Sequence, residues 1–123
     1  MGDLSGLILQ AQARIAETTR EKDAIMYSIG ELDREIAETT RYLAQKETDR
    51  ATVQFARPRS AELDAELERL NYEVTMLVDG LKALESSKAA CLSKMQELDL
   101  KLAGDRRVVE ICSREGSMMD LGE

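Results

Sequence analysis

The stretch from residue 63 to residue 102, LDAELERLNYEVTMLVDGLKALESSKAACLSKMQELDLKL, decides the fold. Its apolar residues recur at alternating intervals of four and three residues. This spacing averages 3.5 residues per turn, which is typical of the contact stripe, or seam, of a left-handed coiled coil. The predicted seam of this stretch is Leu63, Leu67, Leu70, Val74, Leu77, Leu81, Leu84, Lys88, Cys91, Met95, Leu98 and Leu102, and Lys88 alone breaks its apolar pattern.

Signals for both ends of a helix flank this stretch. Ser60 is a candidate N-cap, and two carboxylates follow within the first turn, where they favour the helix dipole. Gly104 stands where a C-terminal cap belongs, with Lys101 just before it. We therefore predict a helix over residues 61–103, followed by a tail over residues 104–123.

The residues before the stretch carry the same spacing in a less pure form. We predict a helix over residues 3–56, with isoleucine prominent in its seam where leucine dominates the other. Two different seams favour helices that pack on each other or on different partners, rather than two copies of one zipper. The predicted seam is Ile8, Ala11, Ile15, Thr18, Lys22, Ile25, Ile29, Leu32, Ile36, Thr39, Leu43, Lys46, Arg50 and Val53.

The single proline, Pro58, separates the two predicted helices within a turn over residues 57–60. Proline cannot continue a helix, and it disfavours the helical conformation of the residue before it. We predict an all-α, single extended unit over residues 1–123, built as an antiparallel coiled-coil hairpin. Paired seam residues would then have numbers that add to about 115, with Ile36 near Leu81. The alternative is one nearly continuous, kinked rod.

The composition excludes several classes of protein. The 123 residues include one proline, one phenylalanine, three tyrosines and no tryptophan, which is too few turn and aromatic residues for a compact α/β or all-β domain. A net charge of −7 disfavours nucleic acid as a partner. There is no apolar run that could span a membrane, and the first residues lack a signal-peptide pattern. We therefore expect a cytoplasmic protein.

Residues for catalysis are lacking. Without histidine, the commonest general base and metal ligand is missing. The carboxylates of residues 62–68 step around the predicted helix and do not converge. We predict no enzyme activity, no catalytic residues, no cofactor and no metal site. Cys91 and Cys112 have no spacing for zinc or for a redox pair and are interpreted as reduced thiols.

Apolar residues outside the seams indicate wider burial than two helices provide. They include three tyrosines, several alanines and Met26, Met76 and Leu100. We therefore expect the hairpin to be part of a larger bundle or filament that contains other coiled-coil proteins. Gly30 and Gly80 lie in mid-helix, and each is either a tolerated surface glycine or a point of close helix approach.

Residues 32–102 resemble the C-terminal half of tektins, the coiled-coil filament proteins of ciliary doublet microtubules. The tektin loop signature reads Arg-Pro-Asn-Val-Glu-Leu-Cys-Arg-Asp. Here Arg57, Pro58, Glu62 and Leu63 match it if one residue is inserted, whereas its Asn, Cys and second Arg-Asp are absent. With one gap, further positions fall on the apolar pattern of the family, namely Leu70, Val74, Leu77, Leu81, Leu84, Met95 and Leu98.

The resemblance implies a structural protein that assembles along the microtubules of a cilium or flagellum axoneme. It implies contact with tubulin through the loop, in which Arg57, Pro58 and Arg59 would meet acidic side chains of a neighbouring subunit. Two alternatives stay open. One is a subunit of a soluble coiled-coil tethering or kinetochore-type complex. The other is a prefoldin-like chaperone subunit, for which residues 51–55 are the one candidate strand.

Overall fold

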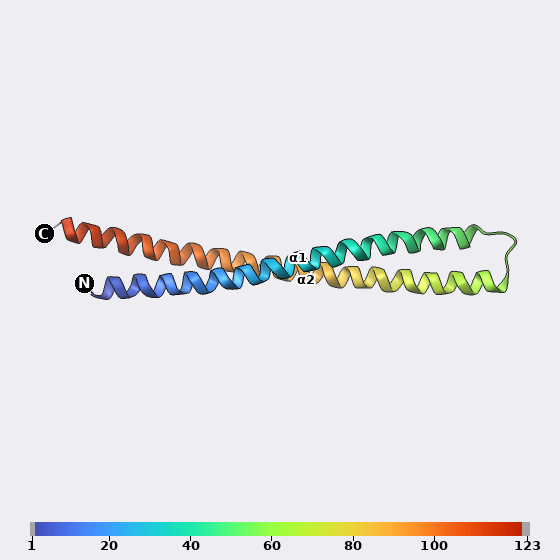
Figure 1. Cartoon of the computed structure of the whole chain (residues 1–123), viewed down its shortest axis with the longest axis horizontal. Coiled ribbons are helices and arrows are strands. Elements are labelled where there is room, and N and C mark those ends of the chain that lie inside the picture. Colours follow the sequence, from blue (N-terminus) through green and yellow to red (C-terminus); the bar gives the residue numbers. More distant parts are fainter. Residues whose placement is uncertain (1, 122–123) are drawn as a thin grey trace. The chain divides into compact units, whose positions relative to one another are not determined.

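The chain folds into two long helices joined by a short loop. The computed structural model describes the backbone of residues 2–121 and the side chains of residues 4–115. Helix α1 spans Gly2–Phe55 and helix α2 spans Ala61–Leu121, and residues 56–60 connect them. The two helices run antiparallel and pack against each other (Figure 1). The all-α hairpin is therefore confirmed, and the kinked rod is not what the chain forms.

The hairpin divides into two compact units. The terminal unit comprises residues 2–28 and 91–121, so it contains the first half of α1 and the second half of α2. The loop unit comprises residues 29–90, with the second half of α1, the loop and the first half of α2. Each unit is a pair of antiparallel helical segments with its own set of contacts across the seam.

Four ion pairs between the helices define the register. In the terminal unit Arg14 pairs with Asp105 and Lys22 with Asp99, and in the loop unit Asp33 pairs with Lys88 and Lys46 with Glu73. The residue numbers of each pair add to 119 or 121. Seam residues therefore face each other when their numbers add to 120, so our value of about 115 was wrong. Ile36 faces Leu84, not Leu81.

The loop explains this shift in register. Arg59 donates to the carbonyl oxygens of Val53 and Gln54 and also forms an ion pair with Asp64. The loop is therefore folded against the end of α1. The first turn of α2 extends beyond the end of α1, so the last turn of α1 faces residues further along α2. As predicted, Ser60 caps α2, because its Oγ accepts a hydrogen bond from the Leu63 amide at 3.1 Å.

The end of α2 differs from our prediction. We expected the helix to end at residue 103 and Gly104 to cap it, but α2 continues through Gly104 to Leu121. A glycine inside a helix costs about 1 kcal/mol relative to alanine. Packing outweighs that cost, because Asp105, Val109 and Cys112 are buried or half-buried at the seam positions that follow it. The predicted tail of residues 104–123 is therefore helical as far as residue 121.

Burial in both units follows the seam. Every predicted seam residue on α1 and α2 is buried or half-buried, whereas most residues between them are exposed. The core is thin, since few side chains are fully covered. The buried side chains of the described residues are Ala11, Thr18, Leu70, Val74, Leu98, Leu102 and Cys112.

The two mid-helix glycines lie on the surface of the hairpin. A Cβ atom built on Gly30 or Gly80 would meet nothing within 4 Å. Neither glycine therefore provides close approach between α1 and α2, and the interpretation of surface glycines agrees with the structure.

Candidate interaction surfaces

Charged residues interrupt the apolar seam, and four of them are matched across the hairpin. Lys22, Lys46, Lys88 and Asp105 occupy seam positions and are half-buried. Each pairs with an opposite charge beside the seam of the other helix, at distances of 2.6–3.0 Å. A polar residue in a coiled-coil seam costs stability but specifies register, because other registers leave its charge unmatched. The four pairs therefore favour this antiparallel alignment over slipped ones.

The Lys46 pair belongs to a larger network in the loop unit. Lys46 Nζ lies 2.9 Å from Glu73 Oε2, and Arg69 Nη1 lies 2.6 Å from Glu73 Oε1. Arg69 also forms an ion pair with Glu66. Contact with the Lys46 ammonium lowers the pKa of Glu73, and the hydrogen bond from Arg69 lowers the pKa of Glu66. The pKa of Lys46 is raised by Glu73 in return.

The arginines of the loop are largely used within the chain. The Arg57 guanidinium donates to the carbonyl oxygens of Gln54 and Ala56, at 3.1 and 2.8 Å. The half-buried Arg59 bonds the end of α1 and Asp64, as described above. The structure therefore gives both arginines a role in capping α1. Contact of Arg57, Pro58 and Arg59 with a partner stays a prediction.

Large apolar side chains are exposed along both helices. They lie outside the seam, at the positions that a coiled coil normally gives to polar residues. Single exposed apolar residues are common in proteins, but two helices alone cannot cover a set of this size. The exposed large apolar residues are Leu7, Leu9, Met26, Tyr27, Tyr42, Phe55, Tyr72, Met76, Leu92, Leu100 and Ile111.

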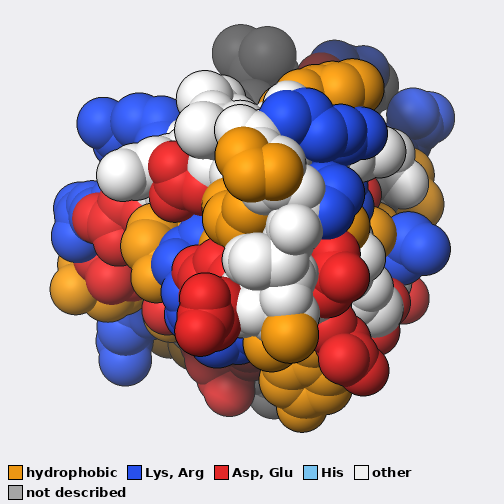
Figure 2. Space-filling view, turned by 90° about the vertical axis from the view of Figure 1, so that its right-hand side faces the viewer, with side chains coloured by type: hydrophobic (Ala, Val, Ile, Leu, Met, Phe, Trp, Pro, Cys, Tyr) orange, Lys and Arg blue, Asp and Glu red, His pale blue; other side chains and the backbone are white. Residues whose placement is uncertain are grey.

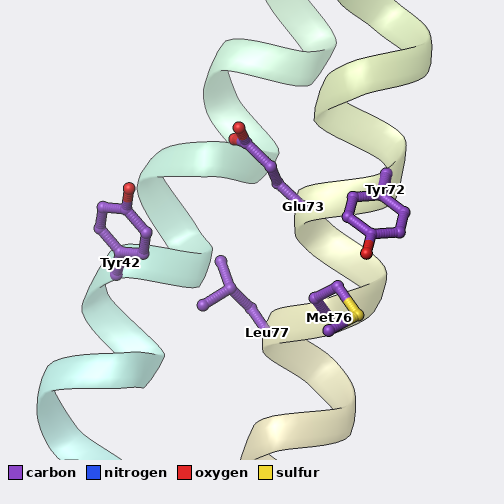
Figure 3. A pocket seen from close by; sticks show the side chains of 5 residues that line it. All are labelled: Tyr42, Tyr72, Glu73, Met76 and Leu77. Carbon is purple, nitrogen blue, oxygen red and sulfur yellow. The ribbon is translucent and has the colours of Figure 1, made fainter.

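Three of these residues surround a hollow in the loop unit. Tyr42 from α1 and Tyr72 and Met76 from α2 line it, together with Glu73 and Leu77 (Figure 3). Leu77 and Glu73 extend toward α1, while Tyr72 and Met76 lie on the outer side of α2. The hollow has a volume of about 290 Å³ and opens to solvent. Its lining is mainly apolar, so it is suited to an apolar side chain.

The remaining surface is mixed in charge. The end of the molecule shown in Figure 2 carries basic, acidic and hydrophobic side chains that alternate over short distances. Among the described residues, no group of cysteine, aspartate and glutamate side chains is arranged to hold a metal ion. Neither helix, over the same residues, contains a segment long and apolar enough to cross a membrane. The thiols of Cys91 and Cys112 are not joined in a disulfide.

Comparison with known protein families, with curated proteins and with solved structures gave no match. The resemblance to tektins therefore rests on the residues of the loop and the apolar pattern alone.

The sequence indicated that the apolar members of the hollow lie outside the seams, but it did not predict that they lie close together. Tyr42, Tyr72 and Met76 were recognised as apolar residues outside the seams. Their proximity depends on the register of the two helices. The apolar spacing is compatible with registers that differ by whole turns, so it does not predict this proximity. The matched charges beside the seam were the signal that could have fixed the register. The candidate strand at residues 51–55 is the last part of α1, so the strands that a prefoldin-like fold needs between its helices are not formed there.

Proposed function

We propose that the chain is a structural, non-enzymatic coiled-coil hairpin that assembles along a cytoskeletal polymer as a tektin-like component of axonemal microtubules. The observation that carries the proposal is the set of large apolar side chains exposed outside the seam. Leu100, Phe55 and Tyr27 are each more than 70% exposed. Covering such residues with neighbouring helices would add about 25 cal/mol of stabilisation for each Å² of apolar surface removed from water.

The assembled role would be mechanical. The two helices have 54 and 61 residues, so each presents side chains at a regular rise of about 1.5 Å per residue. Regular spacing along a helix suits contact with subunits that repeat along a polymer. The internal bonding of Arg57 and Arg59 favours the helix faces over the loop as the main contact.

Sedimentation with microtubules tests this proposal. The purified chain should pellet with salt-extracted axonemal doublets, and Tyr27→Ser combined with Leu100→Ser should reduce the pelleted fraction. Gln96→Ser, at an exposed polar position, serves as the control and should pellet like the wild type. A chain that remains a monodisperse monomer in the supernatant with doublets would contradict the proposal.

A second candidate is a subunit of a soluble coiled-coil tether, and the net charge of −7 favours it. Tubulin surfaces are acidic, and like charges repel each other at long range. In that case the chain would co-purify with helical partners and would not pellet with doublets at any salt concentration.

A further inference from the structure

The face of α1 that points away from α2 in the loop unit carries a regular charged pattern. Two successive heptads, residues 30–36 and 37–43, each begin with a small residue and a glutamate, and an arginine follows three positions after the glutamate. These positions lie opposite the seam, and all of them are exposed except the half-buried Glu31. The residues of this outer stripe are Gly30, Glu31, Arg34, Ala37, Glu38 and Arg41.

The charges of the outer stripe remain open to solvent. Glu31 and Arg34 form an ion pair within the helix at 3.1 Å, and their side chains are still 45% and 67% exposed. Glu38 and Arg41 have the same spacing but form no ion pair among the described residues, and the Arg41 Nε donates to the Ala37 carbonyl oxygen at 3.4 Å. Within these two heptads, no other charged residue points directly away from the seam. The stripe therefore offers two acids and two bases, and its charges balance.

The order of these charges makes the stripe complementary to itself. Read in reverse, Glu-x-x-Arg becomes Arg-x-x-Glu, so an antiparallel copy of the stripe places an arginine opposite each glutamate. When the numbers of facing residues add to 72, Glu31 faces Arg41 of the second copy. In the same alignment Arg34 faces Glu38 of the second copy. The two-fold symmetry repeats both contacts, which gives four contacts of opposite charge. A shift by one heptad leaves two of them, and a parallel copy brings like charges together.

Small side chains in the outer stripe allow the two helices to approach closely. In this alignment Ala37 lies beside the two-fold axis and faces Ala37 of the second copy. A Cβ atom on Gly30, one heptad earlier, would meet nothing within 4 Å, so the space at that end of the stripe is open. Small contact residues permit an interaxial distance of about 8 Å, the short end of the usual range, and this lets the glutamate and arginine side chains reach each other.

We propose that the outer stripe of α1 packs antiparallel against the same stripe of a second copy of the chain, so that two loop units join through matched glutamate and arginine side chains. Charge complementarity selects this occupant, because the pattern that the stripe requires in a partner helix is the pattern that it carries itself. The proposal goes beyond the proposed function, since it needs no polymer and no other protein.

Two sources of repulsion keep the association weak. The chain has a net charge of −7, so two copies repel each other at long range. Glu35 is exposed on one flank of the stripe, where the alignment brings it near Glu35 of the second copy. The acid on the other flank, Asp33, is paired with Lys88. A contact of about four helical turns between such chains should have a dissociation constant on the order of 100 µM.

Sedimentation equilibrium of the full chain tests the proposal. The wild type should convert from monomer to dimer as its concentration rises through about 100 µM. Arg34→Glu combined with Arg41→Glu makes the stripe wholly acidic and should weaken the dimer at least about tenfold, because each of the four contacts becomes one of like charge. The matched control is Lys82→Glu combined with Lys101→Glu. It changes the net charge by the same amount at exposed positions outside the stripe and outside the described ion pairs, so it should weaken the dimer much less.

A variant with exchanged charges tests the direction of packing. Glu31→Arg and Glu38→Arg, combined with Arg34→Glu and Arg41→Glu, keep the net charge and the self-complementary order, so this variant should dimerise as tightly as the wild type. In an antiparallel mixed dimer, however, glutamates of the wild type face glutamates of the variant. Energy transfer between fluorophores on the two proteins should therefore show fewer mixed dimers than random pairing gives. An excess of mixed dimers would indicate parallel packing and would overturn the proposal.

Glu35 offers a change that should strengthen the dimer. Glu35→Gln removes the approach of like charges beside the two-fold axis and should lower the dissociation constant about threefold. Glu47→Gln removes the same charge at an exposed position that faces away from the stripe, so it should lower the constant less. Equal effects would mean that net charge alone is responsible, and would count against the proposed alignment.

Three further results would overturn the proposal. They are a wild type that is still monomeric at about 1 mM, equal losses in the arginine variant and its lysine control, or an exchanged variant that remains helical by circular dichroism but no longer dimerises. Failure to pellet with doublets, in contrast, would count against the polymer and leave the dimer result standing.

Discussion

The terminal unit and the loop unit are both antiparallel helix pairs, but they differ in how completely their seam side chains are buried. Five of the seven buried side chains of the described residues belong to the terminal unit, and three of those five are the small residues Ala11, Thr18 and Cys112. The loop unit buries Leu70 and Val74 only. Small side chains in a seam are easily covered by larger ones from the facing helix, and this favours complete burial.

The seam of the loop unit has more long, charged members than that of the terminal unit, where Lys22 is the only long one among the described residues. Lys46, Arg50 and Lys88 are half-buried in the loop unit, and long basic side chains keep their charged ends in water while their stems cover apolar surface. Such residues leave the seam partly open to solvent. The comparison indicates that the length of the seam side chains, more than the number of apolar residues, determines how completely the seam of each unit is buried.

The largest test of this comparison truncates one leucine in each unit. Leu98→Ala in the terminal unit, where the side chain is 3% exposed, should cost about 3 kcal/mol of unfolding free energy, within the usual range for buried leucines. Leu84→Ala, at a half-buried seam position of the loop unit, should cost about half as much. Urea denaturation followed by circular dichroism measures both. Equal losses would mean that the two seams are sealed alike.

The next test concerns a buried hydroxyl in the terminal unit. Thr18 is 1% exposed, and its Oγ1 has no hydrogen-bond partner among the described residues. A buried unsatisfied polar group costs about 1–3 kcal/mol, so Thr18→Val should stabilise the hairpin by about 1 kcal/mol.

The neighbouring Thr19 provides the control for Thr18. It is exposed, and its Oγ1 donates to the Ile15 carbonyl oxygen at 2.7 Å, so Thr19→Val should give little or no stabilisation. If both variants changed the melting temperature equally, the effect would come from helix propensity and not from burial.

The matched seam charges can be tested by exchange in the loop unit. Lys88→Glu places an acid beside Asp33, whereas Lys88→Glu with Asp33→Lys restores the attraction. The coupling between the two sites should be about 0.5–1 kcal/mol and should shrink at high salt, because Asp33 and Lys88 are partly exposed. A coupling near zero would show that these charges do not help to select the register.

The sequence was sufficient for the helices and their seams but not for their alignment. The alternating spacing of residues 63–102 predicted the buried stripe, and Pro58 with Ser60 located the loop. The alignment depends on how the loop packs, since Arg59 bonds carbonyls at the end of α1. The end of α2 was predicted wrongly at Gly104. The cost of a glycine inside the helix is smaller than the stabilisation from seam packing on either side of it. The hollow needed the alignment before it could be recognised.

Exposed glycines offer a smaller change that should act alike in both units. Gly30→Ala in the loop unit and Gly104→Ala in the terminal unit should each stabilise the hairpin by about 0.5–1 kcal/mol, because alanine restricts the unfolded chain and favours helix. Both sites have room for a Cβ atom. A rise in melting temperature without loss of solubility is expected, and destabilisation at either site would reveal a packing role that the structure does not contain.

The smallest expected effect is the response of the loop-unit network to acid. The pKa values of Glu73 and Glu66 are lowered, by contact with Lys46 and by the hydrogen bond from Arg69, from the usual 4.5. A carboxyl whose pKa is lower in the folded state stabilises it above pH 4.5, and that stabilisation is lost as the pH falls through the folded-state pKa. Glu73→Gln should therefore lower the melting temperature slightly at pH 7, and the difference from the wild type should shrink as the pH falls below 4.5. Glu68→Gln, at an exposed position outside the ion pairs of the described residues, is the control and should differ less at pH 7. A Glu73→Gln deficit that stays constant over the whole acid range in which the wild type remains folded would show that its cause is the packing of the glutamate side chain and not its charge.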